Sequence, residues 1–399
     1  MTTNASRRAF LQRTSLLSMA GVAAPWALNL AAMGEAAAAT ATDYKALVCV
    51  FLYGGNDYGN TLIPYDTARY TLYQGMRPTL AYAQSALAPT LLTPTVALPN
   101  GIQYALAPEG ATSGWGGRMG DLFEAGNGNA TFTCVNVSSN AVFLSGHTAV
   151  QYQVSPSGPV ALNGVKSPLF GSANCSAALH TLVTAPRTHL FENEYTRVMS
   201  RSLFAGDALT TALAGGPVIN TVFPTANALA DQLKLVARMI STSLEVGAKR
   251  QVFFVSMGGF DTHDGLASIH PGLLTSVAGA MSAFYNATVE LGVANQVTSF
   301  TASDFGRTLT ANDGSDHGWG SMHFMLGGAV NGGRFYGTAP VVANDGADDV
   351  GQGRLLPSTS VDQYAATLGK WFGISNSDLL TVLPNLANWN ASQRTLGFV

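Results

Sequence analysis

The chain has 399 residues, of which 47% are hydrophobic and 11% are charged, and its formal net charge at pH 7 is −3. This length and composition allow a large apolar core and exclude a disordered or fibrous chain. No cluster of lysine and arginine is present, so we expect no nucleic-acid partner.

The N-terminal 38 residues have the pattern of a twin-arginine signal peptide. Arg7 and Arg8 precede a modest apolar stretch and then a run of small residues suited to cleavage. Pro25 and Glu35 interrupt the apolar stretch, which is also shorter than the roughly 20 residues of a membrane-spanning helix. We therefore expect a mature protein of residues 39–399 that is periplasmic or secreted and has no stable membrane span.

Five apolar runs have the composition of buried β-strands. Nearly continuous apolar runs of this length are typical of strands that are buried on both faces of a parallel sheet. The runs cover residues 45–53, 130–137, 251–257, 296–303 and, with a glycine-rich sequence, 323–330.

Helical periodicity fills several of the intervals between these runs. Residues 226–247 form an amphipathic pattern, Pro271 is predicted to lie in the first turn of a second helix, and residues 360–374 form a late helix. The alternation predicts one α/β domain with a largely parallel sheet sandwiched by helices. Residues 65–125 and 154–224 have weak periodicity and are predicted to be long loop insertions that shape a substrate cleft.

Polar side chains follow successive strands, at the edge where ligands bind in open α/β sheets. Asp57 follows the first strand, Asp261 and His263 follow the third, and Asp304 follows the fourth, while His317 lies in a later glycine-rich loop. Carboxylate and imidazole together are typical ligands of divalent metal ions. The sequence therefore predicts that these five residues bind one or two divalent ions, such as zinc, manganese or calcium.

Three further residues are candidates for catalysis. Ser145 follows the second strand and is predicted to be either a nucleophile or the cap of a helix. His147 is predicted either to contact substrate or metal or to have a loop role. Arg307 either binds a tetrahedral anion through two hydrogen bonds or forms a salt bridge to a nearby carboxylate. His323 fits a metal ligand and a core residue equally well.

This arrangement resembles the alkaline phosphatase superfamily, which includes sulfatases and phosphoglycerate mutases. The resemblance implies an alkaline phosphatase-like fold and two metal sites. It assigns Asp261, His263 and His317 to the first site. It assigns Asp57, Ser145 and Asp304 to the second.

Two departures from the superfamily pattern bear on the second metal site. Phe305 follows Asp304, where the superfamily has a histidine. One residue separates Asp261 from His263, where alkaline phosphatases have a longer gap. A site for two ions would then need His147 or His323 to supply the missing imidazole.

At closer range, several motifs together resemble the bacterial domain-of-unknown-function 1501 family. They are the export signal, "FLYGGNDYGNTLIP", "GGFDTHDG", "SDFGRT" and "DHGWGSMHFMLGGAVNGGRFYG". The resemblance extends through nearly the whole mature chain.

These observations predict an exported, metal-dependent hydrolase of phosphate or sulfate esters that acts on a small-molecule or polymer substrate. The attacking group is Ser145 or a hydroxide activated by the metal. The alternative is a non-catalytic binding or assembly protein of the cell envelope with a structural or degenerate metal site. Phe305 and the long polar insertions favour this alternative.

Overall fold

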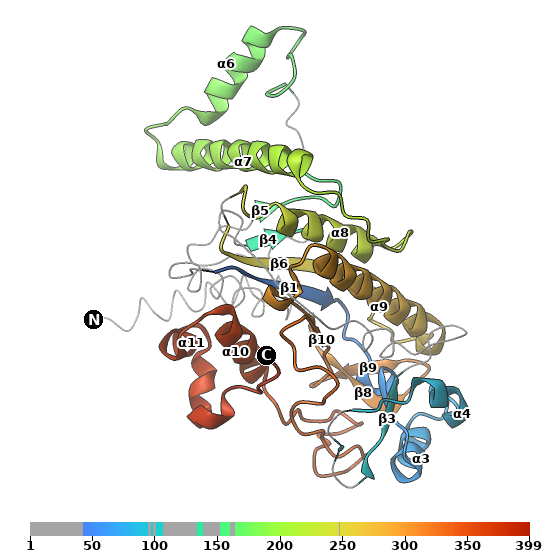
Figure 1. Ribbon diagram of the computed structural model, residues 1–399. Coiled ribbons are helices and arrows are strands. Elements are labelled where there is room, and N and C mark those ends of the chain that lie inside the picture. The colour runs from blue at the N-terminus through green and yellow to red at the C-terminus, as the bar shows by residue number, and fades with distance from the viewer. Residues whose placement is uncertain are drawn as a thin grey trace.

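The computed structural model describes residues 43–94, 97–98, 101–106, 134–138, 152–159, 164–246 and 248–399. At its centre lies a six-stranded sheet with the strand order β10-β7-β1-β6-β4-β5 (Figure 1). Its strands are β1 (Lys45–Leu52), β4 (Cys134–Asn136), β5 (Tyr152–Gln153), β6 (Arg250–Met257), β7 (Val297–Ser303) and β10 (Met325–Leu326). All pairs in the sheet are parallel except β10 with β7, so the predicted largely parallel sheet is confirmed.

Helices cover both faces of this sheet (Figure 1). Alternate residues of β1, such as Val48 and Val50, pack in one core cluster with α8 (Ala228–Ser241) and α9 (Leu266–Glu290). The residues between them, such as Cys49 and Phe51, pack in a second cluster with α10 (Val361–Phe372) and α11 (Asn376–Val382). The apolar run of β1 is therefore continuous because both of its faces are buried.

The remaining elements extend from this layered body. The other helices are α3 (Thr67–Met76), α4 (Gln84–Leu87), α6 (Ala173–Thr184) and α7 (Leu190–Gly215). Two antiparallel pairs are formed by β2 (Leu62–Pro64) with β3 (Tyr104–Leu106) and by β8 (Gly306–Ala311) with β9 (Ser315–Gly318). Short 3-10 helices are η1 (Tyr58–Asn60), η2 (Ala88–Thr90), η4 (Ala294–Gln296), η5 (Pro384–Asn388) and η6 (Ala391–Gln393).

The segments that were expected to be loop insertions contain α3, α4, α6 and α7, so that part of the prediction was wrong. Periodicity was weak in α6 because Ser176 is its one buried residue, and a helix without a buried face has no apolar stripe. Both α6 and α7 lie beyond the β5 edge of the sheet (Figure 1). Within the described ranges, none of the helices combines the length and apolar character needed to cross a bilayer.

Helix α9 begins at Leu266, before Pro271, so the expected position of this proline in the first turn was wrong. A proline inside a helix removes one backbone hydrogen bond. The additional turn is stabilised because it buries Leu266 and His270 completely. Nε2 of His270 also lies 3.0 Å from Oδ1 of Asn56, in the loop after β1.

His270 predicts how the stability of the fold depends on pH. Burial lowers the pKa of His270 from 6.5 to about 4, so the folded protein keeps this imidazole neutral. The unfolded chain takes up a proton below pH 6.5, and the free energy of unfolding should therefore fall between pH 6.5 and pH 4. One such group contributes about 1 kcal/mol per pH unit.

The check is urea unfolding of the wild type and of His270→Gln between pH 7 and pH 4.5. Glutamine keeps a donor toward Asn56 but does not titrate, so the variant should lose less stability on acidification. Equal losses in the two proteins would show that His270 does not cause this pH dependence.

Candidate functional site

The loop after β1 is the part of the site to which the other loops attach. Gly54 and Gly55 have φ angles of +105° and +76°, which favour glycine. Their backbone N–H groups donate to the carboxylate of Asp304 at 3.0 and 2.8 Å. A Cβ atom on Gly54 would lie 2.3 Å from the backbone nitrogen of Asp261. The loop after β6 therefore approaches the loop after β1 too closely for any residue other than glycine at position 54.

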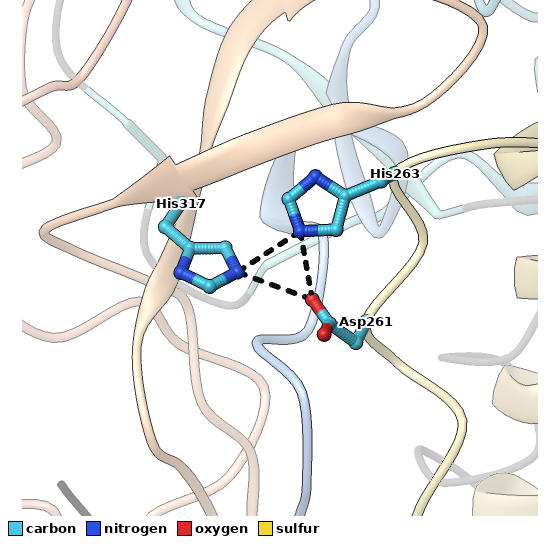
Figure 2. Close-up of side chains that lie close together, drawn as sticks. All are labelled: Asp261, His263 and His317. Carbon is cyan, nitrogen blue, oxygen red and sulfur yellow. Dashed lines mark hydrogen bonds and ion pairs between the residues drawn. The ribbon is translucent and has the colours of Figure 1, made fainter.

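Asp261, His263 and His317 bring three potential metal ligands together (Figure 2). Nε2 of His263 lies 3.1 Å from Nε2 of His317, and Oδ1 of Asp261 lies 3.2 Å from each of these nitrogens. Asp261 and His263 come from the loop after β6, whereas His317 belongs to β9. The structure therefore joins segments that are far apart in the sequence into one cluster, which we call the triad.

The spacing of the triad fits one metal ion. Metal–ligand bonds of about 2.0–2.2 Å at tetrahedral angles place the ligand atoms about 3.3–3.6 Å apart. The three observed distances are close to this value. All three side chains are about half exposed, so a fourth ligand such as water or substrate can approach from solvent.

Neighbouring side chains orient both histidines. Nδ1 of His263 lies 3.1 Å from Oδ1 of Asp316, which favours the tautomer that leaves Nε2 free to bind a metal. The ring of His317 stacks on Phe305, with ring centroids 3.8 Å apart and an angle of 25° between the planes. Phe305 is the residue that replaces the expected histidine, and here it supports a ligand of the triad.

Arg307 contacts the triad through Asp261 and is completely buried. Its guanidinium donates to the backbone carbonyls of Gly54, Gly55 and Ser315 and forms an ion pair with Asp261. The salt bridge that the sequence allowed is therefore present, and the guanidinium is not free to bind an anionic substrate.

The ion pair with Arg307 also affects the charge of the triad. Burial raises the pKa of Asp261, but hydrogen bonds from Arg307 and His317 outweigh it, and the pKa lies below its usual value. Asp261 is consequently ionised at neutral pH, as a metal ligand must be.

Asp57 pairs with a different arginine. Its two carboxylate oxygens accept hydrogen bonds from Nη1 and Nη2 of Arg77, both at 2.8 Å, and both residues are completely buried. Asn60 N–H and Ser315 Oγ also donate to this carboxylate, at 2.8 and 2.5 Å. Burial raises the pKa of Asp57, but Arg77 more than offsets this and brings it to about 2.

The predicted ligands thus occupy three places. In the described part of the chain, the group of histidine and acidic side chains close enough to share an ion is the triad, and it contains neither Asp57 nor Asp304. A second ion held by these two aspartates stays a prediction. Ser145 and His147 lie outside the described residues.

The sequence did not indicate Arg77, because it stands in a segment of weak periodicity without a recognisable motif. His323 is not part of the triad. Nδ1 of His323 lies 3.4 Å from Oγ1 of Thr301, and its ring stacks on Tyr364. Asp316 contacts His263.

Residues 213–382 match a family described as "Protein of unknown function (DUF1501)". This span includes the triad together with Asp316 and Arg307, and the match supports the resemblance to the domain-of-unknown-function 1501 family. No curated protein matches the chain.

The buried pair of Asp57 and Arg77 predicts a large effect on stability. Replacement of Arg77 by methionine leaves a buried carboxylate without its counter-charge, which should lower the free energy of unfolding by about 3–5 kcal/mol. The matched control is Arg69→Met, because Arg69 pairs with Asp66 at 3.1 Å in a partly exposed position. The control should cost at most about 1 kcal/mol.

Urea unfolding at neutral pH measures both variants. An Arg77→Met protein as stable as Arg69→Met would contradict the role of Asp57 as the partner of a buried cation.

Proposed function

We propose that this protein is an exported, metal-dependent hydrolase of phosphate or sulfate esters, related to the alkaline phosphatase superfamily. The observation that carries the proposal is the triad, in which one carboxylate and two imidazole nitrogens lie 3.1–3.2 Å apart with room for a further ligand. Such a set is typical of a catalytic metal site that keeps one position open. The twin-arginine pattern at the N-terminus supports export.

The described residues would each serve this chemistry in a distinct way. Asp261, His263 and His317 would hold the ion, which when bound would act as a Lewis acid on an oxygen of the ester. Asp316 would keep the Nδ1 proton of His263 in place. Arg307 would fix Asp261 while keeping it ionised. Ser145, which lies outside the described residues, is our candidate for the attacking group.

A second function is favoured by the contacts of Arg307 and Asp57. Arg307 and Asp57 are both buried and each is held in an ion pair, and Phe305 stands where the superfamily has a histidine. A chain with one remaining ion site could be a non-catalytic binding or assembly protein of the cell envelope. In that case the ion would join the β6 loop to β9 and stabilise the fold.

The first test measures metal binding and turnover together. Isothermal titration of metal-free protein with Zn²⁺ or Mn²⁺ should give one strong site, and His317→Ala should abolish it because two ligands remain. His180→Ala, on exposed helix α6, is the control and should bind normally. Aryl phosphates and aryl sulfates then report activity in the metal-loaded wild type.

The outcomes separate the proposals. Strong binding with turnover supports the hydrolase, whereas strong binding that raises the melting temperature without any turnover supports the structural role. Unchanged metal binding in His317→Ala would contradict both.

Asp316 provides a finer prediction about the same site. Asparagine at this position keeps the shape but removes the charge behind His263, so metal affinity should fall about 10-fold or more. Asp313→Asn, an exposed change in the same β8–β9 hairpin, is the matched control and should leave affinity unchanged. Equal affinities for Asp316→Asn and the control would show that Asp316 does not orient His263.

A further inference from the structure

Exposed apolar side chains gather on helices α6 and α7, which with the loop between them we call the arm (residues 173–215). Phe191 and Phe204 are 77% and 68% exposed, which is unusual for phenylalanine in a helix. Among the described residues, the exposed large apolar side chains of the arm are Leu182, Leu190, Phe191, Tyr195, Val198 and Phe204.

The arm has little core of its own. Helix α6 buries Ser176 alone, and residues 190–204 of α7 bury Thr196 and Leu203. The two helices diverge from each other (Figure 1), and a shallow groove between them is lined in part by Arg201 and Phe204. Helices in water depend on packing of an apolar face, so this arm is expected to bury its exposed side against another molecule.

Charge on α7 indicates which molecule fits. Along the exposed part of α7, two acidic residues, Glu192 and Glu194, precede two basic residues, Arg197 and Arg201. These charges balance, whereas a helix that lies on a membrane is rich in lysine and arginine on its polar face. A partner with a strong net charge is also unsuited, because the positive and negative charges on this surface of α7 are equal in number.

The order of the charges favours a second copy of the same helix. Glu194 and Arg201 are two helical turns apart and lie on one side of α7. Glu194 pairs with Arg197 of its own helix at 3.1 Å in an exposed position. In an antiparallel pair, Glu194 of each copy also faces Arg201 of the other. A parallel pair would instead place like charges together, so the pattern is self-complementary in the antiparallel arrangement alone.

We propose that two copies of this protein associate through their arms, with α7 packed antiparallel on α7 around a two-fold axis. Alignment of Glu194 with Arg201 of the second copy places the axis between Arg197 and Val198. The same alignment brings Phe191 to the level of Phe204 of the second copy. The interface is isologous, since the same surface serves in both copies. It does not depend on the metal site or on catalysis.

Charge reversal tests this arrangement. The full chain should sediment as a dimer in analytical ultracentrifugation, and Arg201→Glu should raise the dimer Kd about tenfold or more because two attractive pairs become repulsive. Glu194→Arg should have a similar effect. The double variant restores opposite charges across the axis and should recover the wild-type Kd.

Two controls protect the interpretation. Asp231→Arg reverses an exposed charge on α8 and should leave the Kd unchanged, and circular dichroism checks that every variant is folded. In a Cys175→Ser background, Val198→Cys should form a disulfide-linked dimer on oxidation, whereas Val289→Cys, at an exposed position of α9, should not.

Several results would overturn the proposal. These are a wild type that stays monomeric at about 100 μM, a dimer that Arg201→Glu does not weaken, or a double variant as weak as the single ones. Binding of the monomer to phosphatidylcholine vesicles through the arm would identify lipid as the occupant and would equally reject the second copy.

Discussion

The buried guanidinium of Arg307 is the interaction on which the site depends. It binds the loop after β1, the β9 strand and the carboxylate of Asp261 at once, so it connects three segments from distant parts of the sequence. In register, Arg307 also pairs with His317 across the β8–β9 hairpin. A buried charge is costly unless all its donors are satisfied, and here the same contacts that satisfy Arg307 place two of the three ligands.

The sequence was sufficient for the centre of the fold and for the triad. The strands at 45–53, 251–257 and 296–303 were predictable because burial on both faces requires uninterrupted apolar runs. Asp261 and His263 were predictable because polar residues that follow parallel strands reach the same edge of the sheet. His317 lies in the antiparallel β8–β9 hairpin, and the resemblance to the alkaline phosphatase superfamily was needed to group it with them. Helix α6 was not predictable in this way, because a helix with no buried face carries no apolar stripe. In α7 the apolar side chains lie on exposed as well as buried sides, so they mark no single stripe.

Ion pairing was the main feature that the sequence could not provide. Asp57 and Asp261 both follow strands and both looked like metal ligands, yet Asp57 is enclosed with Arg77 and Asp261 remains half exposed. The difference lies in which arginine reaches each carboxylate. Packing brings Arg77 to Asp57, and both residues are far from the triad in the sequence. Residue type and spacing alone do not contain that information.

The separation of the ligands along the chain determines when an ion can be held. His263 and His317 are 54 residues apart in the sequence, and β7 and β8 form between them. Asp261 and His263 alone offer an ion two ligands, so binding through three requires the strands and the hairpin to have assembled first. An ion bound there closes a long loop, and the entropy cost of that closure is already met by the folded sheet. Metal uptake would thus report that the chain has completed its fold.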